Sequence, residues 1–361
     1  MKRIFALILV FCLVLCGCAT KPVETLPTTE PTTEPTTEPT TEPTTVPTEP
    51  PVIYRNPLNG SVLEEAYTGR AVAVVINNLV DALPQYGIGS ADFMYEIETE
   101  GGITRFLAVY SQLEGVDSIG PVRSARTFFN NVALSYDAPI VHCGGSVRGR
   151  NAYADRDGSK ISGWEHLDQV NNGSYFFRDK GRYSSGYNWE HTLFTKGEDL
   201  LRAMADKEYD MRKAADFGLL FEEEPQVDGY VANKLVVNFR NNKTSTFTYD
   251  AGTKLYAAEQ YGITHIDAGT GEQMKYRNVM VVYTSQTFRH DGEYSRSYYE
   301  LVGEGEGQLA VNGVLTAIKW SRADRNSPFV YTYEDGTPVT LGVGKTYVAV
   351  ACGDRGSVEF E

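Results

Sequence analysis

The chain has 361 residues, 47 acidic against 33 basic side chains, and a formal net charge of −14 at pH 7. A negative protein repels phosphate backbones, which argues against nucleic acid as a partner. The length suffices for two domains, and the 23 tyrosines and 16 phenylalanines favour a β-rich fold.

Residues 1–17 resemble a lipoprotein signal peptide. Lys2 and Arg3 precede an apolar run, residues 4–15, that is too short to span a bilayer stably. The run ends in Leu-Cys-Gly-Cys, a sequence similar to a lipobox, which predicts that Cys18 carries the lipid, including palmitate, and becomes the mature N-terminus. A plain secretory signal or an uncleaved anchor is the alternative. Acyl chains on Cys18 would hold the protein at the outer face of the cytoplasmic membrane, outside the cytoplasm.

Residues 18–51 are expected to form a disordered tether. The unit Pro-Thr-Thr-Glu repeats from Pro27, and it combines rigid prolines with glutamates that repel one another. Such a segment would allow the folded part to stand away from the membrane.

Residues 52–225 are predicted to form an N-terminal α/β domain with a mixed sheet. Strand-like runs alternate with helical patterns, which is typical of α/β or α+β proteins. A helix is expected after Arg123, with Ser124 as a candidate N-cap, and another from Thr195, which has capping-box spacing with Glu198. The expected strands are 71–77, 93–98, 106–111 and 139–142.

Residues 226–361 are predicted to form a smaller, mostly antiparallel β domain after an acidic boundary at 222–225. Asn-Gly at 312–313 and Asp-Gly at 335–336 separate alternating segments, which is a strong hairpin signal. Trp320 is expected in the core. The expected strands are 235–240, 244–249, 279–283, 297–302, 308–311, 315–320, 329–333 and 346–351.

Several motifs resemble the YerB-like lipoprotein family (DUF3048). The most specific are Glu-Gly-Gly-Ile-Thr-Arg-Phe at 100–106, Gly-Pro-Val-Arg-Ser-Ala-Arg at 120–126 and His-Cys-Gly-Gly-Ser at 142–146. The similarity extends over residues 54–351. It implies a bacterial surface lipoprotein with an α/β N-terminal domain and a β C-terminal domain, and it implies no particular activity. The chain departs from the family pattern at Asn77, Leu79 and Leu83, where relatives carry acidic, His and Arg residues, so a site built there would be modified.

Glu96, Glu98 and Glu100 alternate on a predicted strand and should face one side. Carboxylates brought together raise one another's pKa, as in acid/base pairs. The favoured interpretation is a structural salt-bridge network with three nearby arginines, Arg105, Arg123 and Arg126.

The arginine-containing loop at 120–126 lies ahead of a predicted helix. A helix N-terminus offers free N–H groups and the positive end of the helix dipole. With Arg123, Arg126 and Ser124, it predicts an anion pocket, unless the arginines only neutralise the glutamates.

His142 ends an apolar strand at a Gly144-Gly145 turn, where open sheets place their sites. Ser146 with His142 or His191 is conceivable as a nucleophile with a base, but no Gly-x-Ser-x-Gly elbow is present. Cys143 and His142 should face opposite sides of the strand. Cys143 and Cys352 either pair or remain buried free thiols. The five histidines show no metal-ligand spacing, and neither a metal nor another cofactor is expected.

An aromatic cluster at 164–189 predicts a long structured loop. At least half of it is expected in the core, and the remainder could line a cleft and stack on sugars. The cluster consists of Trp164, Tyr175, Phe176, Phe177, Tyr183, Tyr187 and Trp189.

The sequence thus favours a lipid-anchored envelope protein that binds an anionic or carbohydrate ligand, a cell-wall polymer or a wall-synthesis protein. No complete catalytic motif is present, so binding is favoured over catalysis. The expected ligand-binding residues are Arg105, Arg123, Ser124, Arg126, His142, Gly144, Gly145, Ser146 and His191. The alternative is a wall glycan or peptide hydrolase or lyase that uses Glu96, Glu100, His142 and His191.

Overall fold

The computed structural model describes residues 52–146, 165–213, 216–240, 243–291, 294–352 and 357–361. The predicted signal peptide, Cys18, the tether and Trp164 lie outside these ranges. Residues 52–361 form one compact unit. No helix in the described part of the chain has the length and apolar character needed to cross a bilayer.

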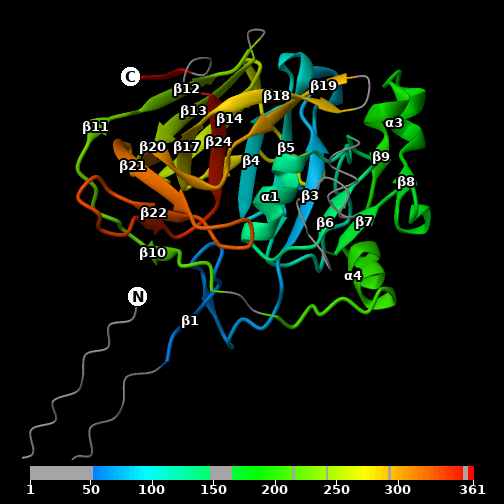
Figure 1. Ribbon diagram of the computed structural model, residues 1–361, viewed down its shortest axis with the longest axis horizontal. Coiled ribbons are helices and arrows are strands. Elements are labelled where there is room, and N and C mark those ends of the chain that lie inside the picture. The colour runs from blue at the N-terminus through cyan, green and yellow to red at the C-terminus, as the bar shows by residue number, and fades with distance from the viewer. Residues whose placement is uncertain (1–51, 147–164, 214–215, 241–242, 292–293, 353–356) are drawn as a thin grey trace, which may run out of the picture. The chain divides into compact units, whose positions relative to one another are not determined.

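A central eleven-stranded sheet organises the described chain, in the order β11-β21-β20-β17-β24-β4-β5-β3-β6-β7, with β22 also paired to β21 (Figure 1). Its strands are β3 (Val72–Asn77), β4 (Phe93–Glu98), β5 (Thr104–Tyr110), β6 (Ile140–His142), β7 (His166–Asp168), β11 (Tyr230–Val231), β17 (Asn278–Thr284), β20 (Gly303–Val311), β21 (Val314–Arg322), β22 (Val330–Thr332) and β24 (Thr346–Cys352).

Strands from both halves of the chain meet in this sheet. β24 pairs in parallel with β4, and β17 pairs in parallel with β24. The mixed sheet agrees in part with the predicted fold class, but the structure does not confirm an N-terminal α/β domain followed by a separate β domain. The sequence pattern predicts where the strands lie, but it does not predict which strand β24 pairs with, because the packing of the whole chain decides that pairing.

The parallel strands end together at one edge of the sheet, which we call the carboxyl edge. β4 and β3 both run antiparallel to the intervening β5, and β6 and β7 continue in the direction of β3. Asn77, Glu98 and His142, the last residues of their strands, therefore lie along the same edge. Ligand sites of open α/β sheets form at such edges.

One face of the central sheet is covered by α1 (Thr127–Ser135), whose Phe128 and Val132 share a hydrophobic cluster with Val75 and Tyr95 of the sheet. We call this the helix face. Alternation along a strand sends Ala73, Val75 and Asn77 to this face and their neighbours to the other.

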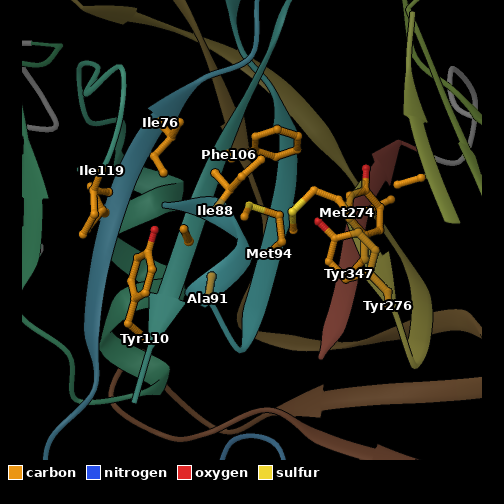
Figure 2. Packing of buried hydrophobic residues seen from close by; sticks show 14 of the residues in the cluster. Ile76, Ile88, Ala91, Met94, Phe106, Tyr110, Ile119, Met274, Tyr276 and Tyr347 are labelled. Atoms are coloured by element: carbon orange, nitrogen blue, oxygen red, sulfur yellow. The ribbon is translucent and has the colours of Figure 1, made fainter. Parts of the chain in front are cut away.

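The opposite face carries a second, six-stranded sheet of order β15-β14-β13-β12-β25, with β16 paired to β14; we call it the sheet face. Figure 2 shows Met94 of the central sheet close to Met274, with Tyr276 and Tyr347 beside them, and Ile76 and Phe106 belong to the same hydrophobic cluster. Burial of such large apolar side chains stabilises the packing by roughly 1.5–3 kcal/mol each. The strands are β12 (Lys234–Asn238), β13 (Thr244–Asp250), β14 (Leu255–Gln260), β15 (Ile263–Thr264), β16 (Lys275–Tyr276) and β25 (Ser357–Phe360).

The remaining elements are short and lie around these two sheets. The helices are α3 (Lys180–Ser184) and α4 (Gly197–Asp206), and the 3-10 turns are η1 (Val80–Ala82), η2 (Ile88–Ser90), η3 (Glu100–Gly102), η4 (Gly173–Tyr175) and η5 (Trp189–His191). The two-stranded pairs are β1 (Tyr54–Arg55) with β2 (Val62–Leu63), β8 (Phe177–Arg178) with β9 (Leu193–Phe194), β10 (Leu220–Glu222) with β23 (Thr340–Gly342), and β18 (Gln286–Asp291) with β19 (Tyr294–Tyr299).

The expected helices are present, but the expected caps are wrong. α1 begins at Thr127 with Arg126 at its N-cap, and α4 begins at Gly197 with Lys196 at its N-cap, neither with a side-chain cap bond. The Thr195 hydroxyl instead donates to the Tyr175 carbonyl at 2.8 Å. Ser124 lies too early to cap α1, because residues 122–125 remain extended between two strands.

Candidate functional site

The loop Gly120–Arg126, called the arginine loop below, lies between β3 and the turn that follows β6. The Arg123 N–H donates to the Val75 carbonyl at 2.9 Å, and the Cys143 N–H donates to the Arg123 carbonyl at 3.0 Å. The Ala125 N–H donates to the Gly144 carbonyl at 3.1 Å. These backbone bonds hold the arginines at the carboxyl edge, directly before the N-terminus of α1.

Glycine is required at the start of this loop. Gly120 has φ 148°, and a Cβ built there would lie 2.9 Å from the Leu193 carbonyl oxygen. The family-like motif at 120–126 thus has a local structural reason.

Arg105 projects from β5 on the helix face and is only 5% exposed. Its Nη1 donates to the Ser124 carbonyl at 2.7 Å, while its Nε has no hydrogen-bond partner. Among the described residues, no carboxylate lies within salt-bridge distance of it. Burial, together with the charges of Arg126 and Arg123, lowers the pKa of Arg105 well below its usual value.

Arg126 is paired, as the sequence analysis expected, with Glu100. Its Nε lies 3.0 Å from both carboxylate oxygens, and its Nη2 donates to Oε2 at 2.7 Å. Arg296 of β19 lies 3.3 Å from the same carboxylate. Burial would raise the pKa of Glu100, but the bonds and charge of Arg126 outweigh it, so that this pKa is lowered.

Arg123 pairs with a different carboxylate from the one expected. Its Nη1 lies 2.9 Å from Oε2 of Glu190, whose side chain is 47% exposed. A half-exposed counterion is held weakly, because surface ion pairs contribute only about 0–1 kcal/mol. Arg105, Arg123 and Arg126 with their loop are called the arginine cluster below.

The histidines and the glycine turn lie along the same edge. His142 Nδ1 lies 2.7 Å from the Gly144 carbonyl, and His191 Nδ1 lies 2.8 Å from Asn77 Nδ2. Burial lowers the pKa of both rings, which keeps them neutral near pH 7. Neutral rings suit hydrogen bonding better than charge pairing.

The turn after β6 contacts the arginine loop through its backbone. Gly145 bridges to Ala125, and the Ser146 N–H donates to the Ala125 carbonyl at 3.4 Å. The structure therefore places the predicted His142–Ser146 turn beside the arginine loop.

Glu96 lies in a separate, closed cluster on the sheet face, which we call the glutamate cluster. Its Oε1 lies 2.8 Å from Lys243 Nζ and accepts from Thr104 at 2.5 Å and Asn78 at 2.9 Å. Its Oε2 accepts from the hydroxyls of Ser245, at 2.6 Å, and Tyr347. Glu96 and Lys243 are 0% and 1% exposed.

The protonation of Glu96 follows from these contacts. Burial would raise the pKa of Glu96, but Lys243, Ser245 and Thr104 outweigh it and lower the pKa. Burial lowers the pKa of Lys243 against the opposing charge of Glu96. The carboxylate is ionised, saturated with donors and shielded from solvent.

The sheet thus separates residues that the sequence analysis grouped together. Glu96 faces the second sheet, whereas Arg105, on the neighbouring β5, faces α1. Glu98 pairs with Arg240 at 3.1 Å, and only Glu100 meets an arginine that was expected as a partner. The alternative catalytic set of Glu96, Glu100, His142 and His191 is consequently spread over both faces.

Sequence reasoning missed Lys243, Ser245 and Arg240. Lys243, directly before the predicted strand at 244–249, could have been recognised as a candidate partner, because a buried glutamate needs a cation nearby. The strand pattern alone did not show which sheet would cover β4.

Cys143 and Cys352 form no disulfide in the described part of the chain. Cys143 Sγ lies 3.3 Å from Gln169 Oε1, and burial raises the pKa of the Cys143 thiol. Neither observation favours a thiolate nucleophile. Within the described ranges, no group of three or more His, Cys, Asp or Glu side chains is arranged to hold a metal ion.

The fold belongs to a mostly β class: a mixed sheet is flanked by a helix and by a second, antiparallel sheet, and three arginines lie at the carboxyl edge of the mixed sheet. The described N-terminal and C-terminal ranges match two family models, the DUF3048 N-terminal domain over residues 58–210 and the DUF3048 C-terminal domain over residues 235–348. Both carry the description of proteins of unknown function. The chain belongs to the DUF3048 family, as its motifs indicated.

A curated relative extends this assignment. The chain is 27% identical over 299 residues to the "Putative lipoprotein YerB" of Bacillus subtilis (strain 168), covering 81% of this chain and 85% of the relative. The crystal structure of the Bacillus subtilis YerB protein is similar with a TM-score of 0.72 and 26% identity, over 84% of this chain and 99% of that one.

Proposed function

We propose that this protein is an extracytoplasmic lipoprotein, anchored through Cys18, whose arginine cluster binds a phosphate or carboxylate group of an envelope polymer. The anchor is supported by the signal-like N-terminus and by the name of the Bacillus subtilis relative. The tether would give the folded part reach into the wall.

The main support for the proposal is that Arg105 is buried with few hydrogen-bond acceptors around it. A guanidinium has five N–H donors, and leaving a buried cation short of acceptors is costly. Arg105 is 5% exposed, yet its described side-chain bond is to a single carbonyl, and Arg123 and Arg126 add like charge around it. An anion between these arginines would supply the missing acceptors.

The surroundings favour the same ligand. The N-terminus of α1 has no side-chain cap, so its first N–H groups and its dipole are directed towards this edge. Glu190 is the exposed partner of Arg123, and a bound anion can displace it at small cost. In a chain of net charge −14, a local group of arginines also steers anions to one place.

Residues 52–361, which contain both hydrophobic cores, allow a direct test. The change is Arg123→Gln, and the matched control is Arg202→Gln, since Arg202 is a 55% exposed arginine paired with Asp199. Binding is measured to purified cell walls before and after chemical removal of their phosphodiester polymers, and to inorganic phosphate. Each good charge-assisted contact contributes about 1.5–3 kcal/mol, so Arg123→Gln should weaken binding about tenfold or more.

The control variant should bind like the wild type, and added salt should weaken binding. Equal binding of wild type and Arg123→Gln to walls and to phosphate would contradict the proposal.

A further inference from the structure

Two hollows lie beside η1 and α3, and Asn188, which lines one of them, is two residues before Glu190, the partner of Arg123. One, of about 340 Å³, is lined by Val80, Asp81, Leu83 and Asn188, and the other, of about 320 Å³, by Pro84, Tyr86, Asp179 and Arg182. Both are also lined by Ser185 and Tyr187. Each is near the lower end of the volume range of small-ligand pockets.

Tyr187, which lines both hollows, is held in place by two contacts. Its hydroxyl donates to the Leu83 carbonyl at 3.1 Å, and the Arg182 guanidinium lies 4.1 Å from its ring centroid. Arg182 is itself held, because it donates to the carbonyls of Pro84 at 2.9 Å and Ala82 at 2.8 Å. The two hollows are therefore preformed rather than dependent on a flexible side chain.

The lining of the hollow beside Val80 combines apolar surface with short polar groups. Val80 is 44% exposed, and Leu83 and the Tyr187 ring add further apolar surface. Asp81, Ser185 and Asn188 add a carboxylate, a hydroxyl and an amide. Asp81 repels a second anion but accepts hydrogen bonds from hydroxyl groups, so the lining suits a neutral, hydroxylated ring.

An exposed aromatic pair connects α3 with η5. Trp189 and Tyr183 are each 57% exposed and meet edge to face at 5.6 Å. Arg178 lies 4.5 Å from the Trp189 ring centroid and donates to the Trp189 carbonyl at 2.6 Å. The next residue, Glu190, is the partner of Arg123, which joins this surface to the arginine cluster.

The structure differs here from the expectation that at least half of the 164–189 aromatics are core residues. None of the described members is buried: Tyr175, Phe176 and Tyr187 are intermediate, and Phe177, Tyr183 and Trp189 are exposed. Large exposed aromatic rings beside polar groups are typical of binding surfaces.

From this arrangement we infer that the two hollows are consecutive subsites for two neutral sugar rings of a glycan, whose phosphate or carboxylate lies on the arginine cluster. The inference rests on the proposed function, because it identifies the rest of the molecule that carries the anion. Two hollows of similar size that share one fixed ring fit a repeating polymer better than a single small molecule.

The test separates the sugar subsites from the anion site. Residues 52–361 are titrated calorimetrically with a panel of neutral di- and monosaccharides of hexoses and N-acetylhexosamines, and separately with inorganic phosphate. Val80→Trp fills one hollow, and Val330→Trp is the matched control, because Val330 is 52% exposed on β22. Asp81→Asn is a second variant that removes the acceptor charge without adding bulk.

Disaccharides should bind more tightly than monosaccharides, and Val80→Trp and Asp81→Asn should each weaken disaccharide binding about tenfold, with phosphate binding and the Val330→Trp control unchanged. The inference is overturned if no disaccharide of the panel binds, or if both Val80→Trp and Asp81→Asn bind it like the wild type. Loss of phosphate binding by Arg123→Gln with intact disaccharide binding supports both sites. Disaccharide binding by a wild type that binds neither phosphate nor walls would contradict the proposed function and leave the sugar subsites standing.

Discussion

The glutamate cluster and the arginine cluster lie on opposite faces of the same sheet, and their polar groups are satisfied to very different degrees. Glu96 accepts from Asn78, Thr104, Ser245 and Tyr347 and pairs with Lys243. Arg105 is also nearly buried, but its described side-chain bond is to one carbonyl, and the like charges of Arg126 and Arg123 act on it more strongly than the opposite charge of Glu100.

The number of hydrogen-bond partners of a buried charge therefore distinguishes charged residues that stabilise the fold from charged residues that can bind a ligand. The buried pair of Glu96 and Lys243 connects β4 to the second sheet, and the Glu96 carboxylate has no hydrogen-bonding capacity left for a ligand. Arg105, at the edge of the sheet and beside the weakly held Arg123–Glu190 pair, still has N–H groups that can donate to a ligand.

The largest effect is expected from Lys243→Met, which leaves Glu96 buried without its cation. Removing one partner of a buried pair typically costs about 3–5 kcal/mol. The free energy of unfolding, measured in urea, should fall by about that amount. The double variant Lys243→Met/Glu96→Gln should recover much of the loss, and a loss below about 1 kcal/mol for the single variant would remove the structural role of the cluster.

The second prediction concerns the free energy of unfolding at acidic pH. The pKa of Glu96 is lowered in the folded protein, so its ionised form contributes stability that is present above the pKa of an unfolded glutamate and is lost as the pH falls through the folded pKa. The stability difference between wild type and Glu96→Gln should therefore shrink below about pH 4.5.

Glu98 provides the contrast, because burial raises its pKa and its ionised form carries no such acid-labile stability. Urea unfolding across this pH range is the measurement. If the Glu96→Gln difference is independent of pH while that of Glu98→Gln shrinks in acid, the assignment of the two carboxylates is reversed.

A smaller effect is expected from Glu190→Gln, which removes the exposed counterion of Arg123. Because such a pair contributes about 0–1 kcal/mol, phosphate should bind up to about fivefold more tightly. Glu198→Gln, a change of another exposed glutamate, is the control and should leave phosphate affinity unchanged. Weaker phosphate binding by Glu190→Gln would mean that Glu190 positions Arg123 rather than competing for it.

Local pattern predicted much of the fold near the site. β4 has the predicted bounds, Phe93–Glu98, and α1 follows the arginine loop as expected. The second sheet was harder to predict from sequence, because β14 (Leu255–Gln260) contains two alanines and charged or polar residues and lacks a strong strand signal.

The sequence was a poorer guide to which charged residues form ion pairs with one another. Alternation correctly placed Glu96 and Glu98 on one face of β4, and Trp320 is buried as expected, at 2% exposed. Arg105 follows at the start of the next strand, but its position in that strand directs it to the opposite face, so proximity in sequence was misleading. Lys243 and Arg240 reach the glutamates only through the packing of the second sheet.

Replacement of Arg105 by the apolar, unbranched Met tests the central claim most directly. Arg105→Met removes a buried cation without leaving a buried carboxylate unpaired, so the free energy of unfolding should stay within about 1 kcal/mol of the wild type or rise. Phosphate should lose its stabilising effect on thermal unfolding in this variant and keep it in Arg202→Gln. A variant destabilised by about 3 kcal/mol or more that is still stabilised by phosphate would show that Arg105 is structural.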